Sequence, residues 1–381
     1  MRLVSALDSW DGQDFTGPAL FAIEGDRLTR VDTRPTDDRG AGNINGTGYI
    51  NGTAHINGTA HIAGTLFPGF TDSHVHLGLV DPNRLVPGGI ARVVDLGSDP
   101  ALIRDLAASS PVDLEYAGAF LTAAGGYPVG RTWAPAASIR EVMSARESAA
   151  AVDEMTAAGA SVIKVALNSG VDGTGPVWDD RMLGTVVRQA HDAGLPVVAH
   201  AEGIGQAMRA IRAGADRLAH TPWTELLSDD DVREAADTCS WISTLDIHGW
   251  GDRGAEFGIA LDNLSRFSAA GGHVLYGTDL GNGPLPVGIN TRELEALIAA
   301  GLSPEAVVGA IAPGPLQGRV SIIRGLAGAD RTAAAPDRAA LDRAAPNRTA
   351  PDRTKPDRSA LADWLSTATV HSVRDLEETF A

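Results

Sequence analysis

Lysine is nearly absent from this sequence, although the chain has 31 lysines and arginines together. The two lysines are Lys164 and Lys355. Lys355 lies in a charged, proline-rich tail, whereas Lys164 interrupts the apolar, β-branched run SVIKVAL, which is typical of a buried strand. Burial of an unpaired ammonium group costs several kcal/mol or removes its proton. Since arginine cannot supply a primary amine, we expect the side chain of Lys164 to have a chemical role.

Cysteine, long apolar runs and net positive charge are also scarce or missing. The single cysteine, Cys239, excludes an internal disulfide and a thiolate zinc cluster. No run of roughly 18 apolar residues is present, so a membrane-spanning helix is not expected. The first residues, MRLVSALDSWDGQD, have no apolar signal-peptide core, and we therefore expect a cytoplasmic protein.

The charge balance is acidic, with a formal net charge of -17 and an isoelectric point near 4.9. A surface of this sign repels the phosphates of nucleic acids and the headgroups of anionic membranes. Neither nucleic acid nor a membrane is therefore expected as a partner.

The two ends of the chain differ in composition from its middle. Residues 1–35 read as short strands with turns, and residues 44–65 contain the hexapeptide repeat INGTGY-INGTAH-INGTAH-IAGT. A hexapeptide period is typical of a β-helix, but about three turns are too few to stand alone. An expanded loop or strand on a small β-domain is favoured instead. Residues 331–359 repeat a Pro-Asp-Arg theme, which predicts a disordered linker, and apolar residues return in 360–381.

From residue 66 onward a different unit recurs, in which a helical pattern ends in Ala-Gly and a short apolar strand follows. An Ala-Gly ending suits a helix C-terminus that needs a left-handed residue. Continuous apolar strands that alternate with helices indicate a parallel sheet buried on both faces. A polar residue stands at or near the end of each strand, as in AAGASVIKV at Lys164, DAGLPVVAH at His200, RAGADRLAH at His220 and AAGGHVLYGTD at Asp279.

Eight such strands can be counted, in TLFPGFTDSHVHL, IARVVDLG, LEYAGAFLT, SVIKVAL, PVVAH, DRLAH, CSWISTLD and HVLYGTD. Eight β/α units predict an α/β fold with a closed (β/α)8 TIM barrel over residues 66–315. The active site of such a barrel lies at the C-terminal ends of its strands. The polar residues of the recurring unit fall at those ends.

Two histidines, His74 and His76, stand two residues apart in the segment TDSHVHLG. Period two places both side chains on one face of a strand, where two imidazoles can bind one divalent metal. An H-x-H pair alone is a weak signal. Together with His200, His220 and Asp279 it favours a metal site over a set of core histidines that bond to the backbone.

A metal site also explains Lys164. A desolvated lysine loses its proton more easily, and a neutral primary amine can add carbon dioxide to form a carbamate. The carbamate is an anionic ligand that can bridge two metals. The alternative is a lysine whose stem packs in the barrel while its ammonium group pairs with Asp279.

The motifs HVH, IKVAL, AHAEG, LAH and GTD, in this order over roughly residues 66–312, resemble those of the amidohydrolase superfamily. They are most similar to its two-metal branch with a carbamylated lysine, which includes imidazolonepropionase-like and Xaa-Pro dipeptidase-like hydrolases. The resemblance implies a small composite β-sandwich domain built from the chain ends. Residues 1–65 would form one part, 316–330 a connector, and 360–381 a segment that docks on the sandwich.

The resemblance also implies a role for each matching residue. The implied ligands are His74, His76 and Asp279 at the more buried ion, His200 and His220 at the second, and carbamylated Lys164 between them. Two divalent ions are implied, usually zinc, with manganese or cobalt as substitutes. A hydroxide shared by the ions would attack the substrate carbonyl. Asp279 would carry its proton to the leaving nitrogen.

Substrate recognition is expected in the loops beyond the third, fourth and seventh strands. In TAAGGYPVGRTWAP, Tyr127 and Arg131 would stand above the metals. Arg131 either binds a substrate carboxylate through two parallel hydrogen bonds or is an ordinary surface arginine. His248, in STLDIHGW, is a catalytic and substrate-binding candidate that binds a carbonyl oxygen or carboxylate, or else a rim histidine. Asn168 is a further rim candidate.

The leading hypothesis is a metal-dependent hydrolase that cleaves a C–N amide or cyclic amide bond of a small-molecule substrate. A dipeptide, an N-acyl amino acid or an imidazolone-like compound with a carboxylate would suit it. A lactonase or phosphotriester hydrolase would use the same ligands, because loops decide between such substrates. A non-catalytic scaffold protein is the third alternative, but it predicts lost ligands, whereas all six are present. A homo-oligomer is left open.

Overall fold

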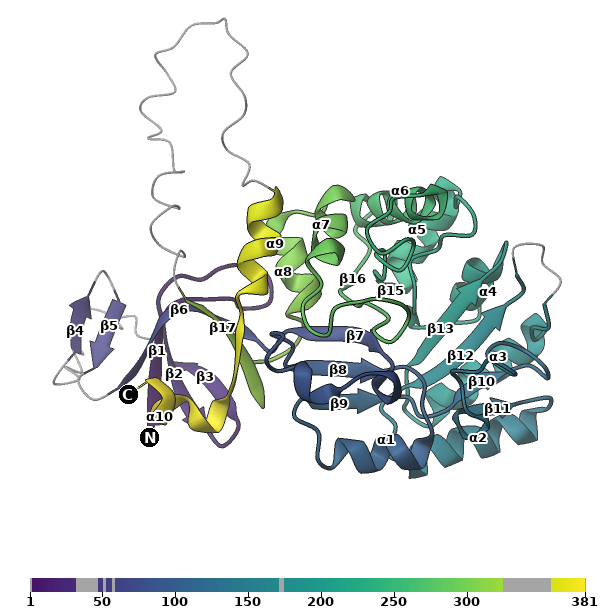
Figure 1. Cartoon of the computed structure of the whole chain (residues 1–381), viewed down its shortest axis with the longest axis horizontal. Coiled ribbons are helices and arrows are strands. Elements are labelled where there is room, and N and C mark those ends of the chain that lie inside the picture. Colours follow the sequence, from purple (N-terminus) through teal and green to yellow (C-terminus); the bar gives the residue numbers. More distant parts are fainter. Residues whose placement is uncertain are drawn as a thin grey trace, which may run out of the picture. The chain divides into compact units, whose positions relative to one another are not determined.

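The computed structural model of this protein describes residues 2–31, 47–50, 53–56, 59–170, 175–324 and 358–380. The chain forms two compact units (Figure 1). The first unit combines residues 1–70 with 314–381, and the second comprises residues 71–313. The predicted Pro-Asp-Arg linker, up to residue 357, lies outside the described residues, as do residues 325–330 of the predicted connector.

The first unit contains a six-stranded sheet whose strands come from both ends of the chain. The strand order is β18-β17-β6-β1-β2-β3. β6 is parallel to β1 and antiparallel to β17, so that Ile322 lies opposite Leu66. The elements of this sheet and its C-terminal segment are β1 (Arg2–Ser9), β2 (Ala19–Glu24), β3 (Arg27–Val31), β6 (Ala60–Pro68), β17 (Arg319–Arg324), α9 (Arg358–Ser366), β18 (Thr369–Ser372), η5 (Val373–Asp375) and α10 (Leu376–Phe380).

Part of the hexapeptide repeat forms a separate antiparallel pair of strands. β4 (Thr47–Ile50) pairs with β5 (Thr53–Ile56), and the last repeat residues lie in β6. The described residues of this unit therefore form one six-stranded and one two-stranded sheet. The composite sandwich stays a prediction.

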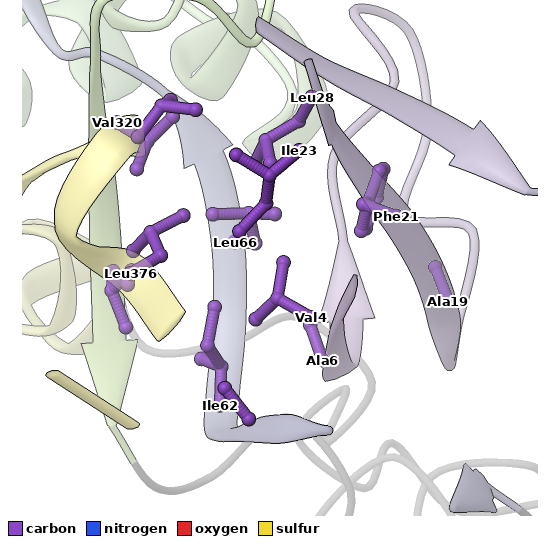
Figure 2. Close-up of a cluster of buried hydrophobic side chains, with 13 residues drawn as sticks. Val4, Ala6, Ala19, Phe21, Ile23, Leu28, Ile62, Leu66, Val320 and Leu376 are labelled. Carbon is purple, nitrogen blue, oxygen red and sulfur yellow. The ribbon is translucent and has the colours of Figure 1, made fainter. Parts of the chain in front are cut away.

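One cluster of apolar side chains forms the core of the first unit (Figure 2). Residues two apart in a strand face the same side of the sheet. Accordingly Val4 and Ala6 of β1 lie in the cluster with Phe21 and Ile23 of β2. Leu376 of α10 belongs to the same cluster. Apolar burial thus joins the N-terminal and C-terminal segments.

The second unit alternates parallel strands with helices. One sheet has the order β7-β8-β9 and the other the order β11-β10-β12-β13-β14-β15-β16, and all pairings within them are parallel. The strands are β7 (Thr71–Val75), β8 (Arg92–Asp95), β9 (Asp113–Tyr116), β10 (Phe120–Thr122), β11 (Ile139–Glu141), β12 (Ile163–Asn168), β13 (Val197–Glu202), β14 (Arg217–Leu218), β15 (Ser240–Ile242) and β16 (Val274–Leu275). This architecture confirms the α/β part of the predicted fold class.

Most helices of the second unit stand between these strands in the sequence, and α7 and α8 follow the last strand, β16. They are α1 (Pro100–Ala107), α2 (Ala145–Ala157), α3 (Asp180–Asp192), α4 (Gln206–Arg212), α5 (Asp229–Thr238), α6 (Ala255–Ala269), α7 (Thr291–Ala299) and α8 (Pro304–Ile311), with short 3-10 helices η1 (Leu77–Leu79), η2 (Pro82–Arg84) and η3 (Ala136–Ser138). In the described parts of both units, no helix combines the length and the apolarity needed to cross a membrane.

The predicted Ala-Gly helix ends are present in the structure. Gly159, Gly194, Gly214 and Gly271 follow α2, α3, α4 and α6, and each has a φ between 76° and 97°. Glycine adopts this region without a Cβ clash. Each of these helices therefore stops, and the chain turns into the next buried strand.

Backbone hydrogen bonds and a shared core connect the two parallel sheets. Ser73 N of β7 donates to Tyr276 O just after β16 at 3.0 Å, and Ser161 N, two residues before β12, donates to Tyr116 O at the end of β9 at 2.9 Å. One buried cluster contains side chains from both sheets and from residues next to their strands, namely Val94, Leu96, Ala117, Val162, Val198, Ala219, Ile242 and Leu275. The two sheets thus surround one apolar core.

The predicted first barrel strand, residues 65–77, is two strands in the structure. β6 ends at Pro68, and β7 begins at Thr71. Leu66 and Phe67 pair with β17 in the first unit, and a proline has no amide hydrogen to extend the ladder. The short strand β11 was not predicted, because its three residues IRE carry no apolar run.

Candidate metal centre

Five of the predicted metal ligands lie at or near the C-terminal ends of parallel strands of the second unit, whereas Lys164, predicted near a strand end, is the second residue of β12. His74 lies in β7 with His76 just after it, Lys164 lies in β12, His200 in β13, His220 just after β14, and Asp279 in the loop after β16. The C-terminal ends of parallel strands share one edge, so side chains there can converge. All six side chains are buried.

Two groups of side chains converge at this edge. In the first, the Nε2 atoms of His74 and His76 each lie 3.1 Å from Oδ1 of Asp279. In the second, Nε2 of His220 lies 3.1 Å from Nδ1 of His200. The ring centroids of His74 and His220 are 4.8 Å apart. The structure therefore brings these five predicted ligands together.

The rings of His74 and His220 are held by hydrogen bonds at Nδ1, the nitrogen that points away from the other candidate ligands. Nδ1 of His74 is 2.9 Å from the carbonyl oxygen of Ala219, and Nδ1 of His220 is 2.9 Å from Oγ1 of Thr244. In metal sites, a partner on one ring nitrogen fixes the tautomer and directs the other nitrogen toward the ion. The Nε2 atoms of both rings therefore face the other candidate ligands, and Nε2 of His220 also lies within hydrogen-bond distance of Nδ1 of His200.

Lys164 reaches the same place with its amine unbonded. Its side chain is 1% exposed, and Nζ has no hydrogen-bond partner among the described residues. Burial lowers the pKa of this lysine to about 7, although Asp279 and Asp95 oppose the shift. The alternative pairing of Lys164 with Asp279 is not seen. A substantial fraction of the amine is thus neutral near pH 7.

The residues present fit a divalent cation. Nε2 of His74, Nζ of Lys164 and Oδ1 of Asp279 are all buried without a hydrogen-bond partner in the described part of the chain. Such orphaned groups are costly unless a ligand satisfies them. Ligand atoms of His74, His220 and Asp279 lie within 4.8 Å of one another. Burial also lowers the pKa of His220 to about 3, which keeps the ring in the neutral form that binds metals.

Glu202 is a member of the site that the sequence analysis missed. Its Oε2 accepts a hydrogen bond from Nδ2 of Asn168 at 2.7 Å and lies 3.4 Å from Nε2 of His200. Burial opposes its charge, but the nearby rings of His200 and His220 outweigh burial and lower the pKa of Glu202 to about 2. Glu202, His200 and His220 form a second group that could hold a metal.

Two sequence signals could have found Glu202. It stands two residues after His200 in the quoted motif AHAEG, and period two places both on one face of β13. Asn168, predicted as a substrate contact, lies opposite Glu202 in the pairing of β12 with β13. The structure thus places Asn168 against a neighbour of the metal ligands.

The loop after β10 lies over the candidate ligands. The ring of Tyr127 stacks on His200, with centroids 4.6 Å apart and an angle of 16° between the planes. The guanidinium carbon of Arg131 lies 5.8 Å from the centre of the Tyr127 ring, and Trp133 lies 5.9 Å from His76. An exposed arginine therefore stands above an aromatic wall beside the site.

His248 reaches the site from the loop after β15. Its ring lies 5.1 Å from that of Trp223, and its Nε2 is buried without a hydrogen-bond partner among the described residues. Burial lowers the pKa of His248 to about 4. This neutral ring can offer one N–H or one lone pair to a bound molecule.

Two further polar residues hold the candidate ligands in place. Oδ1 of Asp72 accepts the amide hydrogens of His74 at 3.1 Å and Thr278 at 3.0 Å, which ties β7 to the loop that carries Asp279. Asn282 donates from Nδ2 to Oδ2 of Asp279 at 2.9 Å. Both contacts fix backbone or side-chain positions that a metal site requires.

The fold is similar to that of solved structures that include a Xaa-Pro dipeptidase and an amidohydrolase, which agrees with the predicted resemblance at the level of the fold alone. No family model matches the sequence, and no curated protein does. The structural likeness covers 85% of this chain in each of three solved structures. All three are at most 20% identical to it in sequence.

These structures are a Xaa-Pro dipeptidase with bound methionine, the ochratoxinase of A. niger, and a prolidase complexed with N-methylphosphonate-L-proline. The first is 18% identical, with 94% of its chain covered and a TM-score of 0.66. The ochratoxinase is 18% identical, with 90% covered and a TM-score of 0.64. The prolidase is 20% identical, with 93% covered and a TM-score of 0.59.

Proposed function

We propose that this chain is a metal-dependent hydrolase that cleaves a C–N amide or cyclic amide bond in a small, carboxylate-bearing molecule. The observation that carries the proposal is the convergence of four imidazoles, one carboxylate and one buried, unbonded amine at the ends of parallel strands. The likeness to structures named as a dipeptidase and a prolidase supports it.

Eight strands act in this proposal as one (β/α)8 barrel, namely β7, β8, β9, β12, β13, β14, β15 and β16. β10 belongs with β9 to the predicted third strand, LEYAGAFLT, and β11 is an additional edge strand. Hydrogen bonds join β7 to the residue after β16 and β9 to the segment before β12, and side chains of both sheets share one buried cluster. In such a barrel the loops after the strands build the active site. Five of the candidate ligands stand at or near that end, and Lys164 joins them from within β12.

The ligands divide between two divalent ions. His74, His76 and Asp279 would hold one ion, and His200 and His220 would hold a second. Imidazole and carboxylate ligands suit zinc, with manganese and cobalt as substitutes. Bound ions of this kind polarise a carbonyl group and lower the pKa of water at the site.

Lys164 contributes its amine as a carbamate. The amine is 1% exposed and has no hydrogen-bond partner in the described residues. A neutral amine can attack carbon dioxide, and loss of one proton then leaves a carbamate anion. This change replaces an unbonded cation by two oxygen ligands among groups that bind cations.

Asp279 transfers the proton. Its Oδ1 faces the Nε2 atoms of His74 and His76, whereas Asn282 holds Oδ2. The carboxylate accepts a proton from the attacking water and delivers it to the amide nitrogen as the C–N bond breaks. Water thus adds its hydroxyl group to the carbonyl carbon and its proton to the leaving amine.

The substrate is oriented by side chains above the ligands. Arg131, over the ring of Tyr127, can form two parallel hydrogen bonds to a carboxylate. His248 presents its unbonded Nε2 to the carbonyl oxygen, where negative charge develops during attack. The contact with Arg131 favours a carboxylate-bearing substrate over a neutral ester or phosphotriester.

Metal removal and a ligand variant test the proposed function. Chelator-treated protein should lose hydrolysis of dipeptides and N-acyl amino acids, and zinc, manganese or cobalt should restore it. His220→Ala should bind less metal and lose at least about 100-fold in kcat/KM. His191→Ala is the matched control, because His191 pairs with Asp216 at 2.8 Å on the surface. Metal content by elemental analysis and hydrolysis rates are measured together.

Two outcomes would contradict this proposal. One is a His220→Ala variant with the parent's metal content and activity. The other is a metal-loaded parent that hydrolyses lactones or phosphotriesters in the same panel but no amide. The second result would move the chain to the alternative reaction class.

A second variant tests the arrangement around His200. Glu202→Gln should weaken metal binding about 10- to 100-fold, because His200 loses the carboxylate beside its outer nitrogen. Glu225→Gln is the control, since Glu225 lies on a neighbouring loop, where its Oε1 accepts the amide hydrogen of Gly205. Competition with a metal indicator measures both affinities. Equal affinities in the two variants would exclude a role for Glu202.

A further inference from the structure

Large apolar side chains are exposed around the candidate site. Among the described residues, seven such side chains are exposed, and four of them stand in loops that follow site-bearing strands. The four are Leu79 after β7 at 45% exposed, Ile204 after β13 at 61%, Leu226 after β14 at 61%, and Trp250 after β15 at 41%. Single exposed apolar residues are ordinary, but a set gathered at one end of a fold is not.

The four loops are connected by close contacts. A Cβ atom on Gly281 would lie 3.2 Å from Cβ of Leu79, and one on Gly283 would lie within 2.5 Å of the indole of Trp250. The loop after β16 therefore joins Leu79 to Trp250. Nε1 of Trp250 also donates to the carbonyl oxygen of Asn282 at 3.1 Å.

The other half of the set is joined in the same way. Gly203 N donates to Oγ1 of Thr224 at 3.2 Å, which places the loop of Ile204 beside the loop of Leu226. Trp223, in the second of these loops, packs against His248. The apolar set thus continues inward to a residue of the proposed active site.

We propose that Leu79, Ile204, Leu226 and Trp250 form an apolar rim that binds a bulky apolar group of the substrate, such as an aromatic ring. The inference rests on the proposed function and extends it to substrate class. When the scissile bond of a substrate lies at the metal ligands, the substituent beyond that bond would contact the rim. An apolar group there removes both its own surface and the rim from water.

The position of Arg131 relative to the rim predicts how this substrate is oriented in the site. Arg131, the exposed cation above Tyr127, stands in the loop after β10, which carries none of the rim residues. The carboxylate is therefore bound beside the loop after β10, and the apolar group against the rim formed by the segments after β7, β13, β14 and β15. Short aliphatic amides would leave the rim uncovered.

A double variant tests the rim without changing any proposed ligand. Ile204→Ser with Leu226→Ser removes the two most exposed rim residues, and Leu102→Ser is the control, because Leu102 is 54% exposed on α1. The probes are 2-naphthoate and 2-naphthylalanine against acetate and alanine. None of these probes has an amide bond, so the metal-loaded protein cannot hydrolyse them. Calorimetric titration should show that the parent binds at least one naphthyl probe about 10- to 100-fold more tightly than its small counterpart.

The double variant should lose this preference, and Leu102→Ser should keep it. Hydrolysis of N-naphthoyl and N-acetyl amino acids should show the same change in KM with kcat retained. Equal binding of large and small probes by the parent would overturn the rim proposal, even in an active hydrolase. An altered association state of the double variant with unchanged probe binding would overturn it too, in favour of a contact between copies of the chain. Probe binding without any hydrolysis would instead support the rim and reject the proposed reaction.

Discussion

Lys164→Ala is expected to lose bound metal and to lower kcat for amide hydrolysis by about 10³-fold or more. Losing one preorganised electrostatic group from an active site already costs about 10²–10³-fold, and this variant also removes a ligand proposed to be shared by both ions. The alanine leaves a space where the amine stood, in a site that is 1% exposed at Lys164. Acetate or propionate at millimolar concentration should partly restore activity by placing a carboxylate in that space.

The carbamate itself can be observed directly, because the chain has so few lysines. Protein equilibrated with carbon-13 bicarbonate should give one lysine carbamate resonance by NMR. The resonance should be absent in Lys164→Ala and present in a Lys355→Ala control. A parent without the resonance, yet fully active, would reject the carbamate while leaving the metal site intact.

Lys164→Met separates function from folding. Methionine fills most of the lysine volume without an amine that needs a partner. Because Nζ has no hydrogen-bond partner in the described residues, the metal-free variant should be more stable than the metal-free parent by roughly 1–4 kcal/mol. Urea denaturation of chelator-treated proteins measures this difference. A less stable methionine variant would mean that the amine makes a structural contact.

Much of the second unit could be predicted because its signals are local. Each Ala-Gly pair predicts where a helix stops, because glycine adopts a positive φ without help from any tertiary contact. Each apolar run that follows predicts a buried strand, and a polar residue at its end predicts a position at the active-site edge. His200 and His220 could be located in this way without knowledge of any tertiary contact.

The features that could not be predicted from the sequence depend on which strands and loops become neighbours in the fold. Glu202 meets Asn168 only because β12 and β13 pair in one register. Likewise, Leu66 and Phe67 read as part of the first barrel strand, but they pair with β17, about 250 residues later in the chain. The apolar rim was equally hidden, because its four residues come from four different loops.

Asp279→Asn is expected to fold like the parent and to lower kcat by about 10²–10⁴-fold, the range of a lost general acid–base group. Asp279 has a φ of 56°, a left-handed conformation that asparagine accepts readily but most other residues avoid. The amide can still bond Asn282 at the oxygen position, but it cannot take the proton of the attacking water. Single-turnover rates at saturating metal measure the loss.

Asp279→Ala should show the same loss of rate together with lower stability. Alanine pays roughly 1–2 kcal/mol for the left-handed conformation and leaves Nδ2 of Asn282 without its acceptor. The difference in stability between the asparagine and alanine variants therefore reports the backbone and Asn282, whereas their shared loss of rate reports the carboxylate.

Asp252→Asn, at an exposed position in the loop after β15, should change neither quantity. An asparagine variant with the parent's kcat would show that proton transfer uses another group, and His248, with its unbonded Nε2, would be the next residue to substitute.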